Sequence, residues 1–228
     1  MMNRTIFNYL FLTAFALSAV FTSCKKDDDK NGNGNGNEKV QLVKTMTFDN
    51  GTFWNFEYDE KNRITTMSGE GLRTLTFTYS GDDLVKLLAE DVIYDFSKSG
   101  NTITINGNWN GEISTTTIEL NNDGYLIASG STAYQYLDGN LVAASNDKYK
   151  YDDKKSPFYN CKTPKWALVW RFMRGWNICS FAIKNNVTEV CYYSKDCLEY
   201  TYEYDENGFP TKMYLDGNEH ATFTYQIK

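Results

Sequence analysis

One short unit recurs along the chain and constrains its fold more than any other feature. Each copy has alternating aromatic and polar residues, a turn rich in Asp, Asn and Gly, and usually a short apolar exit. The copies occupy residues 56–64, 77–85, 118–126, 134–142, 149–154 and 202–210. A period of two places aromatic side chains on one face of a strand and Thr, Glu or Lys on the other. The unit therefore predicts a β-hairpin.

The turns and the alternation together predict the fold class. Asn-Asp-Gly, Asp-Gly-Asn and Glu-Asn-Gly tips tolerate the positive φ that tight hairpins require. Successive hairpins form a meander, and its aromatic face must be buried. We expect an all-β domain, a many-stranded antiparallel meander of hairpins that is curled or closed into a barrel-like sheet. The clearest strands are residues 74–79, 102–105, 199–204 and 222–227.

The hairpin repeat is interrupted between Tyr151 and Tyr200, where a short helix is expected around residues 164–175. Thr163 is suited to cap this helix, with Pro164 at its first position and Gly175 just beyond its end. One face of the helix carries apolar residues at helical spacing, namely Trp166, Val169, Trp170 and Met173. The insertion is either a hydrophobic plug that covers an open end of the sheet or a ligand platform. The platform would use Trp166, Trp170 and Trp176, because aromatic faces stack on sugars and apolar ligands.

The first residues predict export and lipid anchoring. Arg4 and an apolar run over residues 6–20 form a signal peptide, residues 1–23, which is too short for a comfortable membrane span. Phe21-Thr22-Ser23-Cys24 resembles a lipobox, although Phe21 departs from the usual Leu. Cys24 is therefore the expected acylated residue, and it attaches the protein to a membrane.

Residues 24–38 are expected to form a flexible tether, and residues 39–228 a single domain. The charged tract after Cys24 resembles the surface-export signal of Bacteroidetes lipoproteins, and an Asn-Gly repeat follows over residues 31–37. This predicts an outer-membrane lipoprotein displayed at the cell surface. The alternative is the inner leaflet of the outer membrane, with the charged tract acting only as a solvated spacer.

Four cysteines follow Cys24, in a compartment where disulfides persist. The spacing of Cys191 and Cys197 suits a cross-strand bridge beside a hairpin loop, which leaves Cys161 with Cys179. The alternative is free thiols. No zinc or other metal site is expected, because there is no Cys-x-x-Cys and the only histidine, His220, is distant along the chain.

The remaining chemistry predicts a protein that is not an enzyme and needs no cofactor. A net charge of −6 without a basic cluster argues against a nucleic-acid partner. His220 is expected to be a surface strand residue rather than a catalytic base. The paired acids at residues 82–83, 90–91 and 152–153 leave a glycosidase-like pair open, yet most of them stand at expected turns.

The Tyr-Asp pairs at residues 58–59, 151–152 and 204–205 resemble the YD repeats of bacterial surface proteins. With the leader, the Ser-Pro-Phe-Tyr stretch at 156–159 and residues 184–189, the chain resembles a Bacteroidetes lipoprotein family of unknown function with a described porin-like fold. The resemblance covers most of residues 40–228. It implies a curled or closed antiparallel sheet and no catalytic residue.

Three functions follow as expectations. The first is a non-enzymatic binding or accessory module for a glycan or another envelope protein. The second is a structural or adhesive envelope component without a small ligand. The third is a pore, which the polar second face of the strands disfavours, since a membrane barrel needs an apolar outer band.

Overall fold

The structure is a computed structural model, and it describes residues 39–69, 72–172, 182–193 and 196–228. The chain divides into two units, residues 1–37 and 38–228, and every described residue belongs to the second. Among the described residues, no helix is long and apolar enough to cross a membrane.

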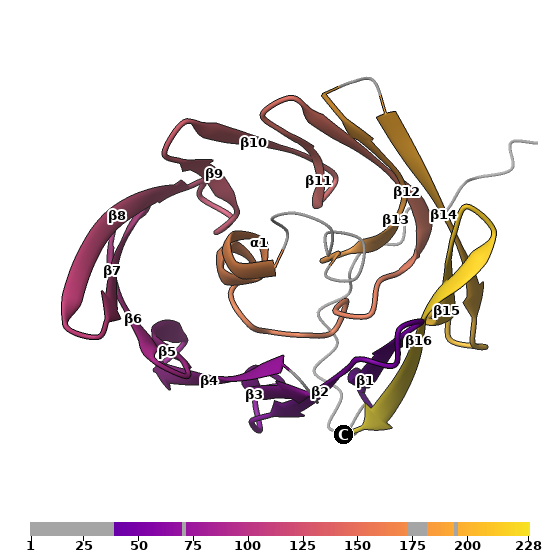
Figure 1. Ribbon diagram of the computed structural model, residues 1–228, viewed down its shortest axis with the longest axis horizontal. Helices are drawn as coiled ribbons and strands as arrows, with labels where there is room; N and C mark the ends of the chain where they lie inside the picture. Colours follow the sequence, from indigo (N-terminus) through magenta and orange to yellow (C-terminus); the bar gives the residue numbers. More distant parts are fainter. Residues whose placement is uncertain (1–38, 70–71, 173–181, 194–195) are drawn as a thin grey trace, which may run out of the picture. The chain divides into compact units, whose positions relative to one another are not determined.

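The described residues form sixteen antiparallel strands that close into a barrel, with one helix, α1 (Lys165–Phe172) (Figure 1). Each strand pairs with its neighbours in sequence, and β1 pairs with β16 to complete the ring. This confirms the predicted meander of hairpins and shows that it closes. The strands are β1 (Gln41–Phe48), β2 (Phe53–Tyr58), β3 (Ile64–Gly69), β4 (Leu72–Ser80), β5 (Asp83–Ala89), β6 (Val92–Ser99), β7 (Thr102–Trp109), β8 (Glu112–Leu120), β9 (Leu126–Ser129), β10 (Thr132–Leu137), β11 (Asn140–Ala144), β12 (Asp147–Lys155), β13 (Asn185–Tyr192), β14 (Asp196–Tyr204), β15 (Pro210–Leu215) and β16 (Asn218–Ile227).

The two ends of the barrel are connected differently. At one end, here the turn end, hairpins such as β7–β8 and β15–β16 close through two residues with positive φ, for example Asn110 at 52° and Gly111 at 91°. The other end, here the loop end, carries the longer β2–β3, β8–β9 and β14–β15 loops and the insertion between β12 and β13. The chain also begins β1 and ends β16 at the loop end, where Val40 and Lys228 exchange backbone hydrogen bonds.

The alternation predicted from the sequence sets the two faces of the wall. In β4, Leu75 and Phe77 are buried, whereas Thr74, Thr76 and Thr78 are exposed. The same pattern holds for the other aromatic and apolar positions expected inside. Ile103, Ile105 and Phe223 are buried, Tyr79, Tyr202 and Tyr225 are half-buried against the same core, and Tyr204 is half-buried. In these strands the inner face is apolar and the outer face is polar.

Residues 156–172 of the insertion between β12 and β13, which we call the plug, fill the barrel from within (Figure 1). Leu168 and Val169 of α1 are buried, and the ring of Trp166 meets Phe96 of β6 edge to face at 5.2 Å. The insertion was expected to cover an open end of the sheet. Its helix instead lies inside the barrel, so the expected position is wrong. A barrel of sixteen strands is too wide for its own inward side chains to fill, so the plug supplies the missing apolar volume.

The helix is confirmed, but its expected cap is wrong. The helix occupies residues 165–172 of the expected 164–175, and residues 173–175 lie outside the described residues. The carbonyl of Pro164 accepts the backbone N–H of Ala167 at 2.9 Å. The Thr163 hydroxyl instead accepts the N–H of Ile64 in β3 at 2.8 Å, because the plug packs against the wall at this point.

Candidate functional site

Three loops at the loop end share one construction. Asp59, Asn121 and Asp205 each accept, through Oδ1, the backbone N–H groups two and four residues later, at 2.9–3.0 Å. Each also receives a backbone hydrogen bond from the residue three positions on, Asn62, Gly124 or Gly208, which has positive φ. These side chains satisfy the loop backbone locally and hold each loop in one shape.

Four tyrosine hydroxyl groups, on β2, β4, β14 and β16, bond to the neighbouring strands at this end. Tyr58, Tyr79, Tyr202 and Tyr225 each donate to the carbonyl of the residue fifteen positions earlier, at 2.7–2.8 Å. Burial raises the pKa of Tyr58, Tyr79 and Tyr225 above the usual value of 10.0. The Tyr58-Asp59 pair thus combines a strand anchor with a loop cap, which gives this Tyr-Asp repeat a structural role.

Asp152 joins three strands where the chain leaves the wall to form the plug. Its carboxylate accepts the backbone N–H of Asn186 in β13 at 3.0 Å and the hydroxyl of Tyr204 in β14. Burial and the neighbouring Asp152 carboxylate raise the pKa of Tyr204. The Asn186 side chain also donates to Asp152, at 3.1 Å. The acid expected to belong to an exposed turn is therefore a structural acceptor.

The first hollow of the loop end has a volume of about 550 Å³. Its lining includes the aromatic residues Tyr125, Tyr159 and Trp166. Carboxylates lie around it, from Asp82 and Asp83 of the β4–β5 turn and Asp123 of the β8–β9 loop. Asp82 forms an ion pair with Lys61 at 2.6 Å, and Asp83 forms one with Lys98 at 3.3 Å. The two carboxylates are therefore engaged with lysines and do not form a free pair of catalytic acids.

The second hollow has a volume of about 590 Å³ and is rich in amide groups. Gln41 donates to Asp205 at 2.6 Å and accepts from Asn207 at 3.3 Å, so these side chains have defined positions. Asn160 of the plug donates to the Gln41 carbonyl at 2.9 Å. The aromatic rings of Tyr159 and Phe209 also line it, with Lys39, Val40, Lys155 and Ile227.

Tyr159 lines both hollows and is 44% exposed. Its ring packs edge to face against Phe209 at 6.4 Å, and the Lys155 ammonium lies 5.7 Å from the ring centre. Sequence reasoning missed this residue as a binding residue, although its Ser-Pro-Phe-Tyr stretch stood out. The available signal was an aromatic residue two positions after a proline in a segment without periodic alternation.

The tryptophans expected to form a ligand platform are placed differently from Tyr159. Trp166 is only 5% exposed and lines the first hollow. Trp170 is half-buried and packs edge to face on Tyr94 at 5.3 Å and on Phe96 at 5.6 Å. Trp176 lies outside the described residues. Trp166 and Trp170 thus contribute to the packing of the plug.

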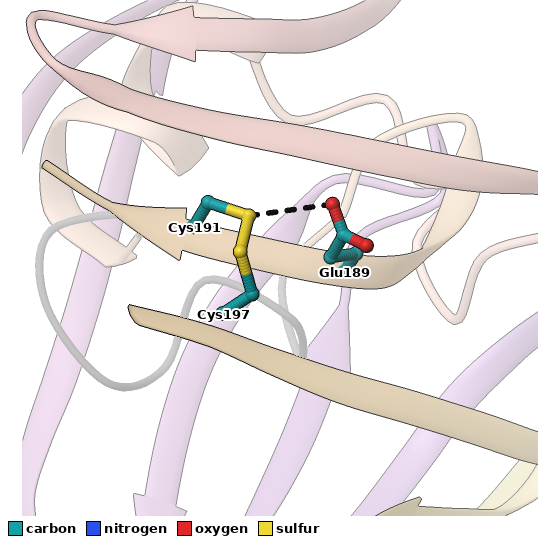
Figure 2. A group of neighbouring side chains, drawn as sticks. All are labelled: Glu189, Cys191 and Cys197. Atoms are coloured by element: carbon teal, nitrogen blue, oxygen red, sulfur yellow. Dashed lines mark hydrogen bonds between the residues drawn. A yellow bond between two sulfur atoms is a disulfide. The ribbon is translucent and has the colours of Figure 1, made fainter. Parts of the chain in front are cut away.

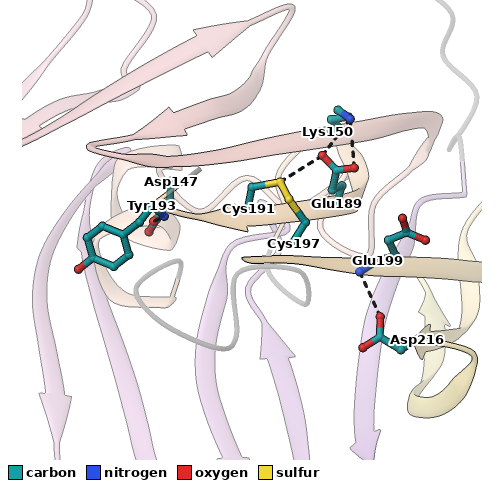
Figure 3. The surroundings of a disulfide bond; sticks show 8 residues. All are labelled: Asp147, Lys150, Glu189, Cys191, Tyr193, Cys197, Glu199 and Asp216. Atoms are coloured by element: carbon teal, nitrogen blue, oxygen red, sulfur yellow. Dashed lines mark hydrogen bonds and ion pairs between the residues drawn. A yellow bond between two sulfur atoms is a disulfide. The ribbon is translucent and has the colours of Figure 1, made fainter. Parts of the chain in front are cut away.

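At the turn end, a disulfide joins Cys191 of β13 to Cys197 of β14, which are directly opposite each other (Figure 2). Glu189 lies beside it, with Oε1 3.3 Å from Cys191 Sγ, and Lys150 of β12 pairs with that carboxylate (Figure 3). Cys161 forms no disulfide with another described residue, and burial raises the pKa of its thiol. Its expected partner Cys179 lies outside the described residues, so the second bridge stays a prediction.

His220 lies in β16 on the wall, where its Nδ1 is 3.3 Å from the Asp49 carboxylate and its ring contacts Phe48. The Glu90-Asp91 pair forms the β5–β6 turn at the turn end, where Glu90 has a φ of 50°. Neither group lines the two hollows of the loop end. The candidate site is therefore the pair of hollows around Tyr159.

Comparison of the sequence with protein-family models and with curated proteins gives no match. Among solved structures, a porin-like protein from Bacteroides uniformis ATCC 8492 is similar, with 13% identity and a TM-score of 0.43 over 83% of this chain and 97% of that chain. A porin-like protein from Bacteroides vulgatus ATCC 8482 has 10% identity and a TM-score of 0.39 over 81% and 99% of the two chains.

Proposed function

We propose that this protein is a lipid-anchored envelope protein whose barrel binds carbohydrate at the loop end without transforming it. The observation that carries the proposal is the exposed ring of Tyr159, which lines two hollows, one with Asp and Lys side chains and one with amide and Lys side chains. A sugar offers a C–H face for stacking and hydroxyl groups that pair with such side chains.

The size and rigidity of the hollows support this function. Volumes of about 550 and 590 Å³ fall within the range of small-molecule sites. The capped loops and the hydrogen-bonded amides around Gln41 hold the lining in place before a ligand arrives, which reduces the ordering cost of binding.

A glycan-array screen of the full mature protein, followed by titration with the best ligand, tests the carbohydrate site. We expect Tyr159→Ala to weaken binding about five- to tenfold, because a lost stacking contact is worth about 1–1.5 kcal/mol. Its melting temperature should stay close to that of the wild type, since the ring is partly exposed.

The matched control is Tyr193→Ala, which removes a ring that is 73% exposed at the turn end. This variant should bind as the wild type does. The carbohydrate proposal fails if the wild type binds no glycan, or if the Tyr159 and Tyr193 variants bind equally well.

The membrane anchor is a separate part of the proposal. Cys24→Ala should release the protein from membranes, because a single diacyl group and the tether are all that hold it there. Fractionation after metabolic lipid labelling measures this. A Cys24→Ala protein that stays in the membrane pellet would contradict the lipid anchor, and protease accessibility of intact cells separates surface display from the inner leaflet.

A second candidate function is adhesion to another envelope protein at the turn end. At the tip of the β7–β8 hairpin, Trp109 is 62% exposed and Ile113 is 71% exposed. Strand β8 pairs with β9 only from Ile118 onward, and residues 112–117 are exposed. An open strand edge of this kind accepts an added strand. Ile113→Lys should abolish such a contact and leave glycan binding intact.

A further inference from the structure

The Cys191–Cys197 disulfide is accessible from outside the barrel. The two residues face each other across β13 and β14, with Cα atoms 4.0 Å apart, and Cys197 is exposed whereas Cys191 is half-buried. Thiol–disulfide exchange requires that a reductant reach one of the two sulfur atoms. This bridge therefore meets the first requirement for reversible opening.

The hairpin does not depend on the bridge to hold the two cysteines together. Val190 pairs with Leu198 on one side of the bridge, and Tyr192 pairs with Asp196 on the other. Val190 is also buried in the core. After reduction, these neighbours would keep the two thiols opposite each other on the same outer face.

A third ligand group is already in place beside the sulfur atoms. Glu189 precedes Cys191 by two residues, so its side chain lies on the same face of β13. The Glu189 carboxylate and the two sulfur atoms all lie within 4.8 Å of one another (Figure 2). Zinc bonds of about 2.0–2.3 Å put tetrahedral ligand atoms roughly 3.5–3.8 Å apart, so side-chain rotation alone can reach this geometry.

The charges around the group suit an anionic metal complex. Lys150 Nζ lies 2.9 Å from Glu189 Oε1 and 3.0 Å from Oε2, and Oε1 also faces Cys191 Sγ at 3.3 Å. When a cation binds Oε1, Lys150 can keep its contact with Oε2, as outer-shell partners of metal ligands do. Two thiolates, one carboxylate and a divalent cation carry a net charge of −1, which Lys150 balances (Figure 3).

We propose that reduction turns this disulfide into a binding site for a thiophilic divalent cation of the Zn²⁺ or Cd²⁺ type. The ligands are Cys191 Sγ, Cys197 Sγ and Glu189 Oε1, and water takes the fourth position. A dithiol reductant supplies two electrons and two protons and leaves as its own disulfide. Cation binding then releases one proton from each thiol. In the oxidised state neither sulfur is a thiolate, so the site is closed.

This site goes beyond the proposed carbohydrate function and is independent of it. The hollows lie at the loop end, whereas the cysteine pair lies beside the β13–β14 connection at the turn end. Either proposal can fail without the other.

Cadmium titration of the full-length protein tests the site, with the thiolate-to-cadmium charge-transfer absorption as the readout. The reduced wild type should bind one more Cd²⁺ than the reduced Cys191→Ser/Cys197→Ser variant, which keeps every other cysteine. The oxidised wild type should match that variant. Removing the reductant and adding an oxidant should expel this Cd²⁺ and restore the Cys191–Cys197 peptide in a disulfide map.

Two single variants examine the carboxylate. Glu189→Gln keeps the size of the side chain and should weaken the additional Cd²⁺ about tenfold or more, whereas Lys150→Ala should change it less. Circular dichroism of each reduced variant confirms that the barrel is intact. Equal Cd²⁺ binding by the reduced wild type and the double serine variant would overturn the site. Unchanged affinity in Glu189→Gln would overturn the three-ligand assignment.

Discussion

The long loops of the loop end and the short turns such as β7–β8 close the same kind of hairpin by different physical means. In the β7–β8 turn, two residues with positive φ, Asn110 and Gly111, reverse the chain, and Asp138 and Gly139 do the same in the short β10–β11 turn of the loop end. In the β2–β3, β8–β9 and β14–β15 loops, side chains hold the backbone, because Asp59 and its counterparts cap the loops and tyrosine hydroxyl groups bond to neighbouring strands. The loop end also receives the plug, whose Thr163 and Lys162 bond to the wall at Ile64 and Asn62.

The difference explains where the candidate ligand site lies. Short turns with positive φ leave little surface and little choice of side chain. Loops held by a few capping groups leave their other positions free to vary, and rigid loops of this kind can carry binding residues. The hollows around Tyr159 are accordingly found at the loop end.

The largest expected effect is loss of the fold at high pH. Burial raises the pKa of Tyr58, Tyr79 and Tyr225 above 10.0, so the folded state keeps protons that the unfolded state loses. Their stabilisation is complete below pH of about 10 and is lost as the pH rises, by up to about 1.4 kcal/mol per pH unit for each group. Circular dichroism and tyrosinate absorbance should change together.

A tyrosine variant sharpens this test. Tyr225→Phe should make the alkaline decline of stability shallower, because one titrating group is gone. If tyrosinate forms while the barrel remains folded, the anchoring hydroxyl groups are dispensable. The claim that they stabilise the loop end would then be wrong.

The next effect concerns the plug. Trp166→Ala should lower the free energy of unfolding by about 3–5 kcal/mol, the range for truncating a buried aromatic, because the ring is buried against Phe96. Urea denaturation measures it. Trp109→Ala at the tip of the turn end is the control and should stay within about 0.5 kcal/mol. Equal losses would show that the plug adds nothing to the interior.

A smaller effect is expected where Asp152 joins the strands. Tyr204→Phe removes a partly buried hydrogen bond to a carboxylate and should cost about 1.5–3 kcal/mol. Tyr214→Phe is matched to it, since Tyr214 donates to Glu203 on the exposed outer face. We expect at most about 1 kcal/mol there. A larger loss in the exposed variant would reverse the ranking of the two regions.

The smallest effect tests the turn end. Gly111→Ala places a Cβ at a φ of +91° but meets no atom within 4 Å, so only backbone strain of about 1–2 kcal/mol is expected. Ser131→Ala, in the neighbouring β9–β10 turn, is the control and should be close to neutral. If melting temperatures of the two variants agree, positive φ is not what specifies these turns.

Local structure could be predicted because it depends on neighbours in the sequence. The period-two pattern of residues 74–79 and 222–227 predicted strands, and the helix over residues 165–172 followed from Pro164 and the spacing of Trp166, Val169 and Trp170. The position of the helix could not be predicted, because the width of a closed barrel depends on how many strands join it. The Thr163 hydroxyl could cap the helix or bond to the barrel wall, and the structure shows that it accepts the N–H of Ile64 in β3.

The sequence by itself determined that this chain forms hairpins with one apolar and one polar face, since those properties follow from alternation and turn residues. Only the tertiary structure decided that the ring closes, that the insertion fills it, and that Tyr159 stands between two hollows. It also brought Glu189, Cys191 and Cys197 within 4.8 Å of one another. Each of these depends on residues far apart in the sequence or on the register between strands, and such contacts arise only when the whole apolar face is buried at once.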